Sequence, residues 1–182
     1  RTVSSAASDV YKRQIFRNLF MYYFLAGLLF FIFIILNIFS ENKSIHNFMK
    51  YIFIIFRSSI VLLFIAHTLG LIARWYISGH APWGDAYESM IYVAWATMGI
   101  GLLFIKKSDL TLASTSFVTS MILMIAHWNW MDPSIANLVP VLNSYWLMIH
   151  VSVIVGSYGP FALSMILGFV SVSYTHLTLP TK

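Results

Sequence analysis

An almost unbroken run of apolar residues, IFRNLFMYYFLAGLLFFIFIILNIF, occupies positions 15–39. It is longer than the roughly 20 residues that an α-helix needs to cross the hydrocarbon core of a bilayer. The rest of the chain is similar, because 59% of the 182 residues are hydrophobic and only 9% are charged. Water-soluble domains carry about 25% charged residues. The composition therefore predicts a membrane protein.

Further apolar stretches follow, separated by loops too short to fold by themselves. They cover residues 51–76, 89–105, 110–128 and 145–169. Backbone polar groups inside a bilayer must be bonded within the segment, so each stretch predicts a helix. We expect an all-α fold, a polytopic helical membrane bundle of about five transmembrane helices that forms one domain over residues 15–169.

The two ends of the chain differ abruptly in composition from the apolar stretches beside them. Residues 1–14 (RTVSSAASDVYKRQ) and 170–182 (VSVSYTHLTLPTK) resemble the peptides produced when sequencing-adapter read-through is translated. We expect both flanks to be artefacts, and the chain to be an interior piece of a longer protein. Four of the 11 Lys and Arg residues lie in these flanks, so the basic balance does not indicate nucleic acid binding.

The basic residues predict which loops face the cytoplasm, because cytoplasmic loops retain Lys and Arg. Lys43 and Lys50 flank the first connection, whereas Lys106 and Lys107 lie in the third. The connections at 79–88 and 129–144 contain neither residue type. We expect these two loops on the outer face.

Two arginines lie near the ends of the second apolar stretch, Arg57 at its inner end and Arg74 at its outer end. Long basic side chains can reach from such positions to the polar surface. Neither arginine therefore has to be a buried charge.

The outer loops are rich in aromatic residues, amides and carboxylates. Trp and Tyr prefer the membrane interface, so an aromatic belt explains any one of them. As a group beside a histidine, they form a platform that suits a flat, largely apolar ligand with polar edges. The residues singled out are Trp83, Asp85, Glu88 and Trp146.

The chain has no cysteine, which excludes disulfides, thiolate metal sites and covalent attachment of haem to this chain. Histidine is the remaining metal ligand of interest. His150 lies about five residues into the last apolar stretch, a few ångströms below the outer surface at about 1.5 Å per residue. This depth suits an axial ligand of haem iron. A packing histidine explains the position equally well.

The other histidines have different contexts. His67 lies midway along the second stretch, where it could bond a neighbouring helix or line a haem path. His80 and His127 lie in or beside the outer loops and are expected to be interfacial hydrogen-bonding groups.

Two segments resemble the cytochrome c assembly family. They are RWYISGHAPWGDAYESMIYVAW at 74–95 and LVPVLNSYWLMIHV at 138–151, the latter followed by Ser157 and Tyr158. More narrowly, they are similar to the CcsA or ResC component, including its fused CcsBA forms. The resemblance implies that His150, in the Trp-Leu-Met-x-His-Val segment, is an axial haem ligand. The family's tryptophan-rich signature and second external histidine lie further downstream, beyond the end of this chain. Residues 128–132 (WNWMD) precede His150 and are not assigned that role.

The resemblance implies cytochrome c biogenesis. Haem b would be received through the membrane bundle, held at the outer face of a bacterial inner membrane, and presented to apocytochrome c, whose thiols add to the haem vinyl groups. The whole protein would be part of a cytochrome c haem lyase or synthase with a CcsB or ResB-like component, and this chain alone would be inactive. A membrane transporter and a non-catalytic scaffold subunit remain as alternatives, since both also contain several apolar helices.

Overall fold

The computed structural model describes residues 3–39, 43–128 and 144–178, and the regular secondary structure in these ranges is entirely helical. This confirms the predicted fold class. In chain order the helices are α1 (Val3–Phe39), α2 (Lys43–Ser78), α3 (Ala86–Leu103), α4 (Asp109–His127) and α5 (Tyr145–Thr178).

Four segments are long and apolar enough to cross a bilayer: Phe16–Asn37, Asn47–Ser78, Asp109–His127 and Tyr145–Gly168. The remaining predicted span, residues 89–105, is present as α3, a helix of 18 residues that is not among these four segments. Helix α3 carries Glu88 in its first turn and lies between α2 and α5, beside α4. The protein is therefore a multi-pass helical membrane protein whose shortest helix is enclosed by longer ones.

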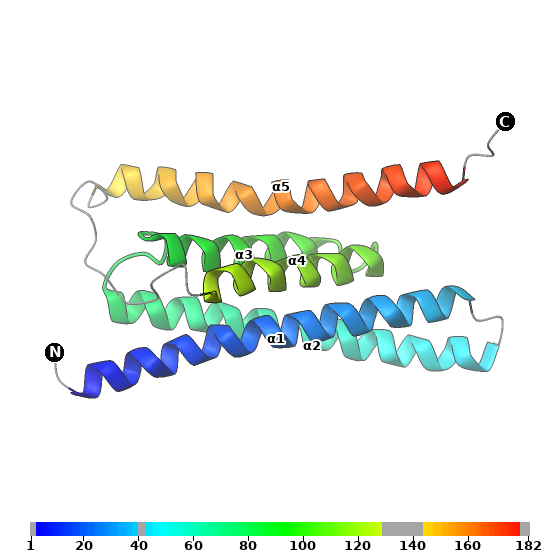
Figure 1. Ribbon diagram of the computed structural model, residues 1–182, viewed down its shortest axis with the longest axis horizontal. Coiled ribbons are helices and arrows are strands. Elements are labelled where there is room, and N and C mark those ends of the chain that lie inside the picture. Colours follow the sequence, from blue (N-terminus) through cyan, green and yellow to red (C-terminus); the bar gives the residue numbers. More distant parts are fainter. Residues whose placement is uncertain (1–2, 40–42, 129–143, 179–182) are drawn as a thin grey trace.

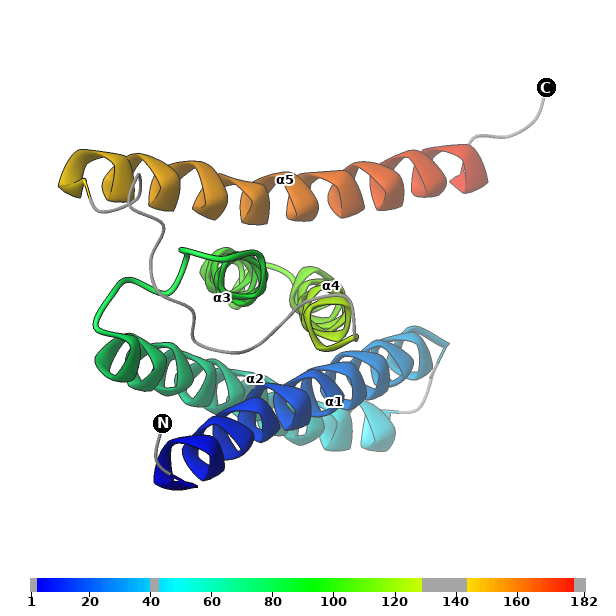
Figure 2. The same ribbon diagram turned by 60° about the vertical axis from the view of Figure 1, so that its left-hand side comes forward.

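The helices form three layers (Figures 1 and 2). The pair α1 and α2 makes one outer layer, α3 and α4 lie in the middle, and α5 covers the opposite side. The connection from α2 to α3 and the start of α5 lie at the same end of the bundle, together with the start of α1 (Figure 1). Charge placement predicts that this end faces outward.

Small residues allow the layers to approach closely. A Cβ atom on Gly27 of α1 would lie 2.9 Å from the backbone nitrogen of Phe117 in α4. On Gly159 of α5 it would lie 2.7 Å from the backbone nitrogen of Thr97 in α3. Helices in lipid associate through this kind of tight packing. Small polar residues add hydrogen bonds, such as Ser116 Oγ of α4 donating to the Tyr23 carbonyl of α1 at 3.0 Å.

The helices extend further than the apolar stretches predict. Helix α2 begins at Lys43, eight residues before the predicted start at 51, because helical hydrogen bonding continues into the polar region. Helices α1 and α5 likewise continue into the flanks 1–14 and 170–182. The artefactual origin of these flanks stays a prediction.

Candidate functional site

A buried ion pair connects the end of α2 with the start of α3. Arg74 Nε donates to Glu88 Oε1 at 2.8 Å, and the two side chains are 4% and 0% exposed. The second carboxylate oxygen of Glu88 accepts the backbone N–H of Gly84 at 3.1 Å. Burying a charge is costly unless it is paired and hydrogen-bonded, and here both conditions are met. The pair therefore fixes how the chain turns from α2 into α3.

Local sequence explains why the chain turns here. Helix α2 ends at Ser78, and Gly79 adopts φ of 71°, the left-handed conformation that glycine accepts without strain. Its N–H donates to the Trp75 carbonyl at 3.0 Å, which closes the helix. Asp85 then precedes α3 with an extended backbone, so Glu88 lies in the first turn of that helix.

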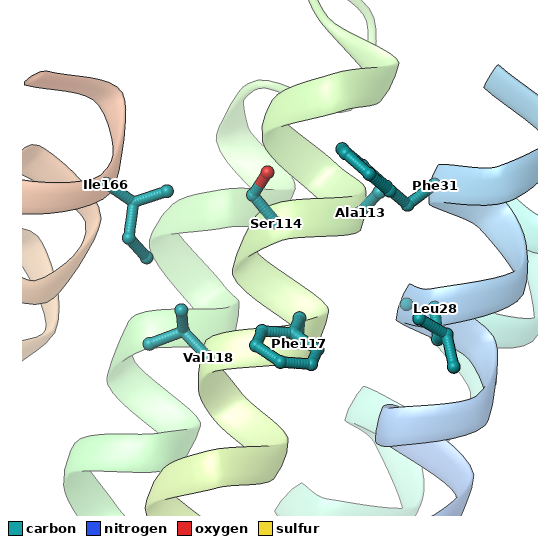
Figure 3. A pocket seen from close by; sticks show the side chains of 8 residues that line it. Leu28, Phe31, Ala113, Ser114, Phe117, Val118 and Ile166 are labelled. Carbon is teal, nitrogen blue, oxygen red and sulfur yellow. The ribbon is translucent and has the colours of Figure 1, made fainter. Parts of the chain in front are cut away.

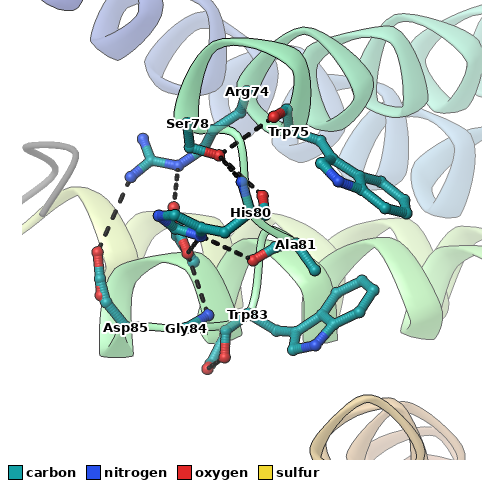
Figure 4. A network of polar contacts seen from close by, with 10 residues as sticks. Arg74, Trp75, Ser78, His80, Ala81, Trp83, Gly84 and Asp85 are labelled. Carbon is teal, nitrogen blue, oxygen red and sulfur yellow. Dashed lines mark hydrogen bonds and ion pairs between the residues drawn. The ribbon is translucent and has the colours of Figure 1, made fainter. Parts of the chain in front are cut away.

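Two more titratable groups complete the cluster (Figure 4). Asp85 Oδ2 lies 4.0 Å from Arg74 Nη2, and His80 Nδ1 lies 3.9 Å from Glu88 Oε2. His80 Nδ1 also lies 3.2 Å from the Ala81 carbonyl. This polar cluster of Arg74, His80, Asp85 and Glu88 places two carboxylates beside one guanidinium, so it does not form an anion-binding site.

Arg74 does not reach the polar surface as the sequence suggested that it could, but is buried. Its guanidinium turns back toward the α2–α3 connection, where Glu88 neutralises it, instead of reaching water. Arg57 fits its prediction better, because its side chain remains 37% exposed. It also makes a bidentate pair with Asp109 of α4, with Nε to Oδ1 at 2.7 Å and Nη2 to Oδ2 at 2.9 Å.

The two histidines predicted to be interfacial hydrogen-bonding groups differ. His80 belongs to the polar cluster, where its Nδ1 lies within hydrogen-bonding distance of the Ala81 carbonyl, whereas the His127 ring stacks on Phe20 at 6.1 Å between centroids. His67 is fully buried, with its ring 5.7 Å from that of Phe16 and 6.1 Å from that of Tyr23. Neither of its ring nitrogens makes a hydrogen bond of ordinary geometry among the described residues, but the ring lies beside the backbone of Ile91 in the neighbouring helix α3.

His150 lies in the second turn of α5, at the end of the bundle that is predicted to face outward. It precedes Gly159, which packs against the α3 backbone, by nine residues or about two and a half helical turns. It therefore lies on the opposite face of α5 and is exposed. Trp146 is one turn earlier on the same side and is 78% exposed.

The structure thus separates the predicted site residues into two groups. Trp146 and His150 share the outward face of α5, whereas Asp85 and Glu88 belong to the polar cluster between α2 and α3. Trp83 connects the two groups through Tyr92. The centroids of the Trp83 and Tyr92 rings are 5.0 Å apart, and Tyr92 in turn lies next to Gly156 of α5. The Arg74–Glu88 pairing was missed from the sequence, although opposite charges flanking a Gly and Pro turn in an apolar chain are a usable signal.

A separate cavity of about 380 Å³ lies deeper in the membrane (Figure 3). Gly27, Leu28 and Phe31 of α1 face Phe117 of α4 across it. Among the described residues that line it, the hydroxyl of Ser114 is the only side-chain polar group. No titratable or metal-ligating side chain lines it, so it offers no haem ligand. Among the described residues there is also no group of three or more His, Asp or Glu side chains that could hold a metal ion.

Comparison with protein families gives a match to the cytochrome c assembly protein model over residues 83–179, more than half of the chain. The chain belongs to the cytochrome c assembly protein family. This confirms the resemblance found in the sequence and assigns the protein to cytochrome c biogenesis. The matched region begins at Trp83, includes His150 and extends into the predicted flank 170–182.

Individual proteins of this family are also similar to the chain in sequence. The protein NrfI of Wolinella succinogenes is 50% identical over 107 residues, which are 59% of this chain and 12% of that protein. The cytochrome c biogenesis protein CcsA of Prochlorococcus marinus (strain MIT 9515) is 32% identical over 155 residues, covering 78% of this chain and 46% of its own length. CcsA of Lotus japonicus is 32% identical over 115 residues, 56% of this chain and 33% of that protein.

The matched part of this chain covers less than half the length of each of these three relatives. In the 128–132 stretch, residues 129–132 lie outside the described part of the structure, as does most of the second predicted outer loop.

Proposed function

We propose that the protein holds haem b at the outer face of a bacterial inner membrane and presents it to apocytochrome c for covalent attachment. Together with a CcsB or ResB-like component, it would form a cytochrome c haem lyase or synthase. Haem is the substrate in this proposal, and His150 is its axial ligand. The observation that carries the proposal is the placement of His150.

The position of His150 fits a haem ligand in three respects. Its side chain is exposed on the side of α5 that faces away from α3, so its imidazole can reach a ligand outside the described bundle. It lies at the outer end of an apolar helix, where a porphyrin can rest on carbon surface with its propionates toward water. Trp146, one turn away on the same side, provides an indole beside that surface.

Asp85, Glu88 and Trp83 have a supporting role in this proposal. The two carboxylates already interact with Arg74, and two anionic groups beside the propionates would be repulsive. They hold the α2–α3 turn, and the turn positions Trp83 on the side of α3 that meets α5 through Tyr92. We propose His67 as an intramembrane haem contact, because its buried ring nitrogens are without hydrogen-bond partners in the described structure.

Haem ligation can be tested on the full-length protein in detergent. The purified protein should show a Soret band, and His150→Ala should abolish the low-spin signature or reduce haem content. Added imidazole should restore the spectrum of His150→Ala by replacing the missing ligand. His127→Ala is the matched control, since His127 also lies at the outer end of a helix but stacks on Phe20. A wild-type protein without haem, or an unchanged spectrum in His150→Ala, contradicts the proposal.

A further inference from the structure

Helix α5 contains a proline in its interior, Pro160. Proline has no backbone N–H, so the carbonyl of Gly156, four residues earlier, cannot accept the usual helical hydrogen bond from position 160. The neighbouring hydroxyl does not compensate, because Ser157 Oγ donates to the Ile154 carbonyl at 2.6 Å. A serine that bonds back to the preceding turn often bends its helix, and sharp kinks occur at prolines. The sequence therefore weakens α5 between residues 154 and 160.

The packing of α5 changes at this proline. Gly159 is buried, and a Cβ atom there would lie only 2.7 Å from a backbone nitrogen of α3. Leu163, one turn further along, is 3% exposed. Before the proline the fit is looser, since a Cβ atom on Gly156 would lie at an ordinary 3.4 Å from the flexible Tyr92 side chain, and none of residues 145–158, all of them described, is buried. Helix α5 is therefore fixed to α3 from Gly159 onward and held only loosely before it.

We call the loosely held residues 145–155 the arm and residues 156–160 the hinge. The arm carries Trp146 and His150. Its tip lies 15 residues from Pro160, a length of about 22 Å along a helix. A change of about 20° at a proline kink moves this tip by roughly 8 Å and His150, which is closer to the hinge, by roughly 5 Å. A modest change of the kink is therefore enough to move the imidazole out of reach of a ligand fixed to the rest of the bundle.

We propose that the arm swings about the hinge and carries His150 toward and away from α3. Prolines are tolerated in membrane helices because neighbouring groups bond the freed backbone and hold the kink. Here the packing is tight on one side of the proline only, since Gly159 and Leu163 are buried and the arm is not. Helix α3 is the main neighbour of α5, which lies across the bundle from α1 and α2 (Figure 2). The arm can thus move while the rest of α5 stays in place.

The importance of this motion for haem rests on the proposed function. A ligand on a rigid helix would hold haem at one position relative to the bundle. On the arm, His150 changes its distance from α3, so haem can be taken up at one position and presented at another. Such movements of a loosely held segment often limit the rate of an enzyme.

The motion is tested by distance measurements between pairs of spin labels on the full-length protein in nanodiscs. Cysteines outside this chain are replaced by serine, and the chain itself has none. The first pair, Tyr145→Cys with Tyr76→Cys, joins the tip of the arm to the end of α2, and both positions are exposed. The second pair, Met165→Cys with Leu103→Cys, joins α5 beyond the hinge to the end of α3, again at exposed positions. We expect the distance distribution of the first pair to be several ångströms wider than that of the second.

The decisive variant is Pro160→Ala, which restores the N–H that bonds the Gly156 carbonyl. It should narrow the distribution of the first pair to the width of the second. Gly168→Ala is the matched control, because it also changes α5 and nothing lies within 4 Å of a methyl group there. A first pair that is as narrow as the second in the wild-type protein, or that stays unchanged in Pro160→Ala, shows a static kink and overturns the inference.

The outcomes separate this inference from the proposed function. The label distances are measured without haem, so they do not depend on His150 as a ligand. With haem, Pro160→Ala should keep the Soret band of the wild-type protein and lower the yield of haem attached to co-expressed apocytochrome c severalfold. An unchanged yield with a narrowed distribution overturns the role of the arm in presentation. An unchanged haem spectrum in His150→Ala instead contradicts the proposed function and leaves the motion of the arm in place.

Discussion

Arg74 and Glu88 are separated by 14 residues and meet at 2.8 Å in an almost water-free environment, across the turn between α2 and α3. Removing one partner leaves the other charge buried and unpaired. Glu88→Gln should therefore destabilise the protein by about 3–5 kcal/mol, measured by unfolding in detergent. The double variant Arg74→Met with Glu88→Leu should recover most of this loss. Equal stability of Glu88→Gln and wild type would show that the pair does not hold the turn.

The second arginine pair should contribute much less. Arg57 and Asp109 make good bidentate geometry, but their side chains are 37% and 22% exposed, so water screens them. We expect Asp109→Asn to cost about 1 kcal/mol or less in the same unfolding assay. A loss as large as that of Glu88→Gln would mean that lipid shields this pair from water.

Gly159 should tolerate no larger side chain. A methyl group there would lie 2.7 Å from a backbone nitrogen of α3, which cannot move as a flexible side chain can. Gly159→Ala should destabilise the protein by about 1–3 kcal/mol by separating α5 from α3. Gly168→Ala is the control on the same helix, because nothing lies within 4 Å of a methyl group at that position. Similar stability of the two variants would contradict the close packing of α5.

The predicted orientation can be measured by cysteine labelling, since the chain has no cysteine of its own. Ala86→Cys at the α2–α3 connection should react with a membrane-impermeant maleimide added outside intact cells. Lys106→Cys, at the opposite end of α3, should react only after the cells are permeabilised. Both positions are exposed, so access to the reagent depends on sidedness alone. The reverse pattern would invert the topology and place His150 on the cytoplasmic side.

His67 offers a contrast between stability and function. Its ring nitrogens are buried without hydrogen bonds among the described residues, which is unfavourable by about 1–3 kcal/mol. His67→Leu should therefore unfold at a higher temperature than wild type. If His67 contacts haem, the same variant of the full-length protein should contain less haem. Higher stability with unchanged haem content would remove His67 from the proposed haem path.

Hydropathy predicted the helical class and the approximate positions of the helices, because the preference of a segment for lipid depends on the apolar residues within that segment. It did not predict where the helices end, since α2 continues from its apolar segment to Lys43 through polar residues. Hydropathy also did not predict that Arg74 is buried. A snorkelling arginine and a paired one have the same sequence position, and only the approach of Glu88 distinguishes them.

The direction of His150 could not be predicted for a related reason. Helix α5 is apolar around most of its circumference, so no polar stripe shows which side packs against the bundle. The close approach of Gly159 to α3 decides it, and this depends on the neighbouring helix. The family motif predicts what His150 binds, whereas the three-dimensional packing shows which way it faces.

The enclosed position of α3 has a consequence for biosynthesis. This helix is not among those apolar enough to cross the membrane by themselves, and its first turn carries Glu88. A translocon that released it alone would place a carboxylate in lipid, which is strongly unfavourable. The carboxylate is neutralised by Arg74, which is synthesised earlier at the end of α2. Helices α2 and α3 should therefore leave the translocon together as a hairpin whose charges are already paired.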